Sequence, residues 1–224
     1  MNKLKRFIRD NRMLLFVLAA IYRFFGVNRI KGKRTLKVSW KGVFAYHMNV
    51  VNCGHRNKLE IEEGCRLKNT TIRFYGNNNF VKIENDCVAN ELEVYVQDDS
   101  NTVSIGHNTH FTGKAHLACI EGCELSIGSR CLLSSEVTFR TGDSHSILDK
   151  EGKRINYSSS ISVGDHVWIG NKVIVLKGTK ISDETIVGTG SIVTGKEFEG
   201  NSVIVGTPAK IIKHDVSWHH ENLK

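Results

Sequence analysis

Proline and aromatic residues are scarce in this chain of 224 residues, which has one Pro and 8% Phe, Trp and Tyr. Its core must therefore be mostly aliphatic, and the 20 glycines favour short strands joined by tight corners. No CxxC pair occurs among the six cysteines. This argues against a zinc or redox motif and favours buried free thiols in the reducing cytoplasm.

Acidic residues are almost missing from residues 1–41, which carry twelve Lys or Arg and only Asp10, a net charge of +11. Because the whole chain carries +8, the remainder carries −3, and the basic character belongs to the N-terminal segment. This distribution, without aromatic–basic interleaving in the body, argues against a nucleic-acid binder.

Residues 1–34 are predicted to form a basic helical segment that stops at Gly26. Its apolar run, from Met13 to Tyr22, has about half of the ~20 residues that cross a bilayer. The helix either caps the open end of the fold or rests on the anionic inner face of the membrane. A signal peptide is a further alternative, with Ala19-Ala20 as a poor cleavage site.

From Ile161 to Val193 an aliphatic residue recurs at every sixth position, and a small or polar residue follows most of them. No α-helix or flat strand has that period, whereas hexapeptides build parallel β-helices, one short strand and one bend each. The aliphatic side chains are predicted to point into a triangular prism. They are Val163, Ile169, Val175, Ile181, Val187 and Val193.

A period of 22 residues precedes the hexapeptides and predicts further stacked coils. Each of these coils is about four residues longer than three hexapeptides supply, so one corner is predicted to bulge. An Asn column is predicted to form a hydrogen-bonded ladder at a corner. The columns are Ile61, Ile83, Ile105 and Ile127; Asn57, Asn79, Asn101 and Cys123; Cys65, Cys87, Thr109 and Cys131; and Leu67, Ala89, Phe111 and Leu133.

The repeat stops after Arg140, and residues 141–160 are polar and keep no inward aliphatic register. A segment of that length inside a compact repeat is either functional or disordered. We therefore expect a β-helix domain over residues 35–213 with a protruding active-site loop at 141–160. Residues 214–224 are predicted to form a polar tail that frays.

His145 is the candidate catalytic group of that loop, in the run Gly142-Asp143-Ser144-His145-Ser146. Imidazole accepts protons near neutral pH. In an extended segment Asp143 and His145 point to the same side, where the carboxylate can orient the ring. The pattern alone has little specificity, and an ordinary surface histidine is the alternative.

The run DSHSILD…GKRIN…ISVGDHVWIGNKVIV…GTKISDETIVGTGSIVT…VIVGTPAKIIK, over about residues 140–213, resembles the hexapeptide-repeat acyltransferases. It is most similar to their sugar and capsule-polysaccharide O-acetyltransferases. The resemblance implies a mainly β fold, a left-handed parallel β-helix, which is an exception to the right-handed crossover rule. It also implies a homotrimer with one active site in each groove between subunits, and acetyl-CoA as the donor.

The same resemblance implies residue roles. His145 would be the general base that lets a sugar hydroxyl attack the thioester directly, with Asp143 as its orienting partner. Trp168 would wall the acetyl and acceptor site, and the lysines would pair with the CoA phosphates. The turn at residues 194–196 departs from the family's common Thr-Lys-Asp. The implied donor contacts are Trp168, Gly170, Asn171, Thr189, Thr194, Gly195, Lys196, Lys210 and Lys213.

The leading hypothesis is an acetyl-CoA-dependent O-acetyltransferase acting on a bacterial surface glycan, such as a capsule, O-antigen or exopolysaccharide unit. A small acceptor such as serine, an amino-sugar nucleotide or an antibiotic suits the same fold and base. A non-catalytic binding module is another alternative.

A metal-dependent β-helix hydratase needs converging histidines with one His-x4-His pair. His107, His110 and His116 lack that spacing, and His214 and His219 lie in the tail, so no metal is predicted.

Overall fold

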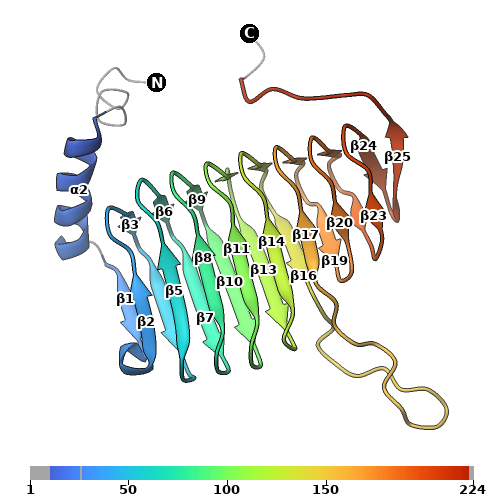
Figure 1. The fold of residues 1–224 in the computed structure, drawn as a ribbon, viewed down its shortest axis with the longest axis horizontal. Helices are drawn as coiled ribbons and strands as arrows, with labels where there is room; N and C mark the ends of the chain where they lie inside the picture. The colour runs from blue at the N-terminus through green and yellow to red at the C-terminus, as the bar shows by residue number, and fades with distance from the viewer. Residues whose placement is uncertain (1–10, 26, 222–224) are drawn as a thin grey trace.

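The computed structural model describes residues 11–25 and 27–221. This part of the chain winds into a left-handed parallel β-helix of about eight turns with three sheets (Figure 1). Sheets A and B have eight strands each, and sheet C has nine. A helix lies at the N-terminal end, and a long loop protrudes from the body nearer the other end. The predicted fold class is therefore confirmed.

The strands are short, and each sheet takes every third strand of the chain, except that β25 follows β24 directly and pairs with it antiparallel in sheet C. Sheet A contains β1 (Arg29–Lys31), β4 (Asn49–Asn52), β7 (Thr71–Tyr75), β10 (Leu92–Gln97), β13 (Ala115–Ile120), β16 (Val137–Arg140), β19 (Ile174–Leu176) and β22 (Ile192–Val193). Sheet B contains β2 (Leu36–Ser39), β5 (Asn57–Ile61), β8 (Phe80–Ile83), β11 (Thr102–Ile105), β14 (Glu124–Ile127), β17 (Ile161–Val163), β20 (Lys180–Ile181) and β23 (Glu197–Phe198). Sheet C contains β3 (Phe44–Tyr46), β6 (Arg66–Lys68), β9 (Val88–Asn90), β12 (His110–Phe111), β15 (Leu132–Leu133), β18 (Trp168–Ile169), β21 (Ile186–Val187), β24 (Val203–Gly206) and β25 (Ala209–Lys213).

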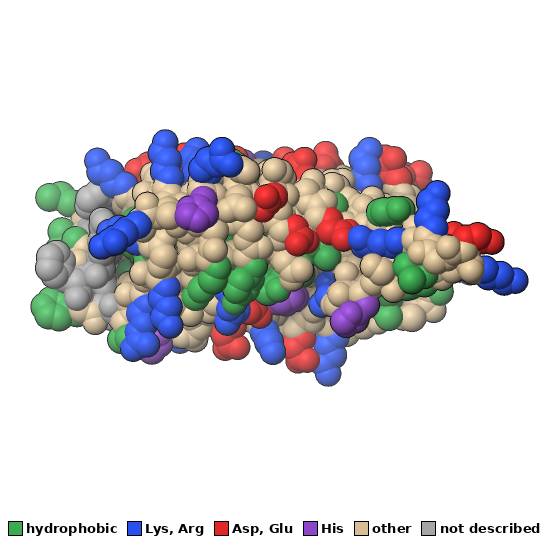
Figure 2. Space-filling model, turned by 90° about the horizontal axis from the view of Figure 1, so that it is seen from below, with side chains coloured by type: hydrophobic (Ala, Val, Ile, Leu, Met, Phe, Trp, Pro, Cys, Tyr) green, Lys and Arg blue, Asp and Glu red, His purple; other side chains and the backbone are tan. Residues whose placement is uncertain are grey.

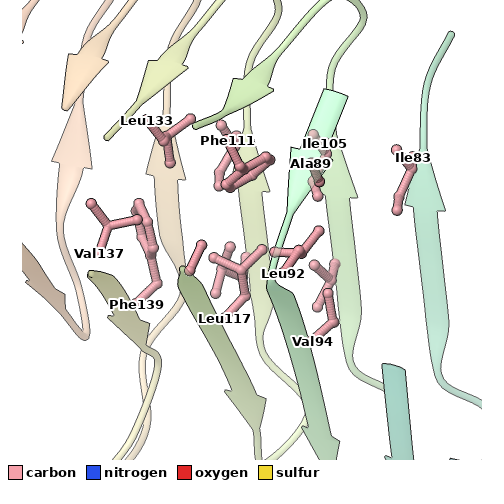
Figure 3. Packing of buried hydrophobic residues seen from close by; sticks show 14 of the residues in the cluster. Ile83, Ala89, Leu92, Val94, Ile105, Phe111, Leu117, Leu133, Val137 and Phe139 are labelled. Atoms are coloured by element: carbon pink, nitrogen blue, oxygen red, sulfur yellow. The ribbon is translucent and has the colours of Figure 1, made fainter. Parts of the chain in front are cut away.

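The pairing register reproduces both periods of the sequence. Ile61 lies opposite Ile83, 22 residues on, and Val163 lies opposite Ile181, 18 residues on. All six hexapeptide aliphatics and the four isoleucines of the longer period are buried. Figure 3 shows Ile83, Phe111 and Leu133 of neighbouring coils in this continuous core. The core fixes the direction of the corners, from which the polar side chains project.

The predicted asparagine ladder is confirmed at the corner where sheet A turns into sheet B, the A–B corner. Asn57 Oδ1 accepts the N–H of Asn79 at 2.8 Å, and Asn79 Oδ1 accepts that of Asn101 at 2.8 Å. The N–H of Cys123 ends the ladder on Asn101 Oδ1 at 3.0 Å. Each buried amide thus satisfies a backbone group of the next coil, as a buried polar group must.

Helix α2 (Arg12–Phe25) covers the open N-terminal end and contacts β3, the edge strand of sheet C. Among the described residues, none of the helices has the length and apolar character that a membrane span requires. The β-helix begins earlier than residue 35, because β1 already pairs with β4 and a short 3-10 helix, η1 (Lys33–Thr35), joins β1 to β2. The sequence does not reveal this first strand, because basic residues flank Ile30, the one half-buried residue in it.

The tail does not fray over residues 214–221, so that prediction is wrong there. Its chain runs back from β25 across the solenoid (Figure 1). The Trp218 ring stacks on the His166 ring with centroids 4.4 Å apart, and its Nε1 donates to the His166 carbonyl at 2.7 Å. The Val216 N–H also donates to the Asn201 carbonyl at 3.0 Å, and Ser217 Oγ donates to Glu184 Oε2 at 2.9 Å. Aromatic stacking and hydrogen bonds therefore hold the polar tail against the body.

Candidate active site

The segment 141–160 forms a loop at the A–B corner, directly beyond the asparagine ladder. β16 ends at Arg140, β17 begins at Ile161, and pairing across the insertion joins residues 36 apart, such as Leu125 and Ile161. The loop closes on itself through a bridge between Leu148 and Arg154. Its first arm carries His145, which is exposed to solvent.

Asn156 holds this first arm, a role that the sequence does not reveal. Its side chain is buried, although most of the loop is exposed. Its Nδ2 donates to Asp143 Oδ2 and to the carbonyl oxygen of His145, each at 2.8 Å. Its Oδ1 accepts the N–H of Ile147 at 2.7 Å. One amide therefore holds the Asp143 side chain before His145 and the backbone of His145 and Ile147.

Glu121, at the preceding A–B turn, ties the second arm of the loop to the body. The Arg154 guanidinium donates to both of its carboxylate oxygens, at 2.5 and 2.9 Å, and Ser158 Oγ donates to it at 2.6 Å. The Arg154 contact lowers the pKa of Glu121 to about 2. A carboxyl whose pKa is lowered by folding stabilises the fold fully above its ordinary value of 4.5, and this contribution declines as the pH falls from there toward 2. The anchor therefore persists at neutral pH.

Asp143 also binds away from the imidazole ring. Lys177 of the next coil donates to its Oδ2 at 2.6 Å, and this contact, with that from Asn156, lowers the pKa of the Asp143 carboxyl. The described hydrogen bonds of Asp143 thus position the loop rather than the ring. Its role as the orienting partner of His145 stays a prediction, beside the backbone support that Asn156 supplies.

A hollow of about 340 Å³ lies between the first arm and the outer face of sheet A. Its volume is within the range of about 300–1,000 Å³ that is common for ligand pockets. In its floor the small Ala118 lies between Tyr95 and Arg140 in register, which leaves the depression. The lining residues are Tyr95, Gln97, His116, Ala118, Ile120, Glu121, Arg140, Gly142, Asp143, Ser144, His145, Ser146 and Arg154. His145 therefore borders a polar space open to solvent.

His116 is a second histidine of this hollow that sequence reasoning did not assign to it. Its Nδ1 lies 3.1 Å from Glu93 Oε2, and Arg73 pairs with the same carboxylate. Burial, with smaller effects from nearby cations led by Arg140, lowers the pKa of His116. The ring is therefore neutral at neutral pH and held in the floor.

The donor residues expected from the sequence lie at three places in one chain. Asn171 and Thr189 follow β18 and β21 at the corner where sheet C turns into sheet A, and the Gly190 N–H donates to the Asn171 carbonyl at 2.8 Å. A Cβ on Gly170 would lie 2.7 Å from the Thr189 nitrogen, so only glycine allows this stacking. The turn of Thr194, Gly195 and Lys196 lies at the A–B corner, and Lys210 and Lys213 are exposed on β25.

Trp168 is on sheet C, with 39% of its surface exposed. The ring of Trp218 from the tail lies 6.1 Å from its ring, so the tail forms one side of its surroundings. In a three-sided prism, sheet C is the face that the A–B corner does not touch. The structure therefore brings His145, Asp143 and the turn at 194–196 to one corner, and leaves Trp168 on another surface of the same chain.

The buried cysteine thiols are not suited to act as nucleophiles at the hollow. Cys119 and Cys131 are buried, and burial raises the pKa of each to about 12. Both are therefore thiols at neutral pH, while the reactive form is the thiolate. Among the described residues, no three His, Cys, Asp or Glu side chains are grouped so as to hold a metal ion.

Known proteins are similar to this chain in both sequence and fold. No family model matches the chain. The polysialic acid O-acetyltransferase of Neisseria meningitidis is 32% identical over 166 residues, which are 74% of this chain and 76% of that protein. The galactoside O-acetyltransferase of Escherichia coli strain K12 is 32% identical over 161 residues, 71% of this chain and 72% of that protein. A polysialic acid O-acetyltransferase of Escherichia coli O1:K1 / APEC is 34% identical, but over only 42% of its own length.

Solved structures agree over most of the chain. The polysialic acid O-acetyltransferase OatWY superposes with a TM-score of 0.77 and 30% identity, over 84% of this chain and 89% of that one. The polySia-specific acetyltransferase NeuO superposes with a TM-score of 0.75 and 27% identity, over 87% of this chain and 88% of that one. The β-helix fold, together with relatives that are O-acetyltransferases, places the chain in the class of β-helix acyltransferases. The chain belongs to the hexapeptide-repeat acetyltransferases of that class, the family of these O-acetyltransferases.

Replacing Asn156 by alanine is expected to lower the turnover number about 10- to 100-fold, because the loop loses two hydrogen bonds to the backbone of His145 and Ile147 and one to Asp143, and the candidate base His145 shifts. Asn156→Asp keeps the size and loses the two donated bonds, so it should fall as well. Lys150→Ala, at an exposed loop position, is the control and should keep wild-type turnover. Thiol release from acetyl-CoA and thermal unfolding are the measurements. Full turnover in both Asn156 variants would contradict this positioning role.

Proposed function

We propose that this protein transfers the acetyl group of acetyl-CoA to a hydroxyl of a bacterial surface glycan, with His145 as the base. The observation that carries the proposal is the exposed His145 at the rim of a polar hollow of about 340 Å³, in a chain whose relatives are sugar O-acetyltransferases. Imidazole beside an open polar space is suited to taking a proton from an incoming hydroxyl.

The reaction balances without a covalent enzyme intermediate. His145 takes the hydroxyl proton while the acceptor oxygen attacks the thioester carbonyl, and the C–S bond then breaks. The imidazolium returns its proton to the departing CoA thiolate, so the base is restored. Cys119 and Cys131 hold protons that burial makes difficult to remove, which supports direct transfer over a thioester on the enzyme.

The proposed binding site for the sugar acceptor is on the outer face of sheet A. The rings of Tyr75 and Tyr95 lie 5.4 Å apart on neighbouring strands, and the ring of His116 lies 6.5 Å from that of Tyr95. Flat rings beside hydrogen-bonding groups suit the alternating apolar and polar surfaces of sugars. Arg140, also in the lining, suits a carboxylate such as that of sialic acid. Two polysialic acid O-acetyltransferases are among the relatives.

The proposed binding site for the donor acetyl-CoA is completed by a second copy of the chain. His145 and Trp168 lie on different surfaces of one chain, so a site that uses both forms where the A–B corner of one copy meets sheet C of the next. A closed ring of three such contacts gives a homotrimer with three equal sites. The exposed Lys196, Lys210 and Lys213 fit the phosphates of CoA, and Asn171 and Thr189 fit its pantetheine arm. The buried free thiols suit a cytoplasmic enzyme.

Thiol release from acetyl-CoA with a panel of acceptors tests this function. Hexose, hexosamine and sialic acid oligomers are compared with serine, an amino-sugar nucleotide and chloramphenicol. We expect turnover that depends on one glycan, because the hollow opens along the aromatic face of sheet A. Turnover with a small acceptor alone would assign the alternative substrate class. Donor binding with no turnover on any acceptor would favour a binding module.

A further inference from the structure

One side of α2 is an exposed apolar stripe. Met13, Val17, Ile21 and Phe25 recur at every fourth position, and 80%, 50%, 46% and 84% of their surfaces are exposed. Side chains spaced in this way lie along one face of a helix. Val27, directly after the helix, is also exposed. Because α2 contacts β3, this stripe faces away from the part of the solenoid that the helix covers.

The first coil of the solenoid, which follows the helix in the chain, is rich in exposed cations. The first coil exposes Arg29, Lys31, Lys33, Arg34, Lys37 and Lys41, none of which forms an ion pair within the described residues. The sequence has no acidic residue from Asn11 to Leu59, so no carboxylate of the first coil itself opposes these cations. Of these cations, Glu60, Glu62 and Glu63 of the second coil lie near Lys37 and Lys41. Figure 2 shows apolar side chains exposed at the α2 end with Lys and Arg beside them.

We propose that this end of the β-helix docks on an anionic lipid bilayer, with α2 lying in the plane of the interface. An apolar stripe beside exposed cations is the arrangement by which amphipathic helices bind such surfaces. At 14 residues, α2 rises about 21 Å, which suits a position along the interface. The proposal goes beyond acetyl transfer, and it places a glycan carried on a lipid within reach of the enzyme.

Vesicle co-sedimentation of the full chain tests the docking. The wild type is expected to bind vesicles of phosphatidylglycerol mixed with phosphatidylcholine, to bind pure phosphatidylcholine weakly, and to dissociate as salt rises. Ile21→Glu should weaken binding about tenfold or more, because a charge replaces an apolar side chain that would insert into the bilayer. Ile212→Glu is the matched control, an exposed isoleucine on β25 at the other end, and should bind like the wild type.

A second measurement guards against a helix that no longer forms in the variant. A fluorophore on Val17→Cys, in a Cys53→Ser background that removes the exposed thiol, should shift to the blue when anionic vesicles are added. An unshifted probe together with no wild-type binding would overturn the proposal, and so would equal binding by Ile21→Glu and the wild type. An oligomer that Ile21→Glu disrupts, without any vesicle binding by the wild type, would instead assign the stripe to contacts between copies. These readouts are independent of acetyl transfer.

Discussion

Replacing His145 by alanine is expected to lower acceptor-dependent thiol release from acetyl-CoA by a factor of about 100 or more, the usual contribution of a general base. The side chain is exposed at the rim of the hollow, so its loss should leave the fold unchanged. Thermal unfolding and CoA binding should match the wild type. The deficit should therefore be in the turnover number.

His116 is the matched control, because it is a histidine of the same hollow. Its ring is held in the floor beside Glu93, so His116→Ala should raise the KM of the acceptor more than it lowers the turnover number. Turnover that survives His145→Ala would remove that residue from the mechanism. A loss as large in His116→Ala, with full activity in His145→Ala, would transfer the role of base to His116.

Mixing two damaged chains is expected to restore activity. Trp168→Ala and His145→Ala each impair every site when present alone, by loss of the proposed wall and of the base. In trimers assembled from an equal mixture, about one site in four combines His145 from one copy with Trp168 from the next. Turnover should therefore rise from near background to about a quarter of the wild-type value.

The control for this mixture is a chain that carries both substitutions, mixed with the wild type. The activity of this mixture should be proportional to the number of sites formed by two wild-type copies, with no activity restored beyond that number. If each site were built within one chain, the mixture of single variants would show only the mean of their separate activities. That outcome would contradict the shared site, while His145 could still be the base.

The periodic parts of this fold could be predicted from the sequence because each coil repeats the same local requirement. Val163 and Ile181 are buried at equivalent positions 18 residues apart, and both lie in one column of the prism. The ladder of Asn57 and Asn79 follows from equal spacing in the same way. Because the coils stack, residues one period apart in the sequence are neighbours in space. Their contacts can therefore be predicted from their spacing alone.

The loop could not be predicted in this way because it has no period. Its position was marked by the loss of the aliphatic register, but its internal structure depends on single contacts. Asn156 bonds to Asp143 across thirteen residues, and Ser158 reaches Glu121 across 37. Neither pairing follows from propensity or spacing. The contact of Trp218 with His166 is equally unpredictable, because it joins residues 52 apart. This stacking helps to order a tail whose sequence is mostly polar.

Following a ¹³C-labelled acetyl group from acetyl-CoA to a glycan by NMR would show whether the protein is a glycan O-acetyltransferase with His145 as its base. We expect the label to appear as an ester on a sugar hydroxyl of one glycan when the wild type is present. We expect His145→Ala to leave that glycan unlabelled at the same enzyme concentration. Label on an amine, label only on small acceptors, or equal labelling by the variant would contradict this function.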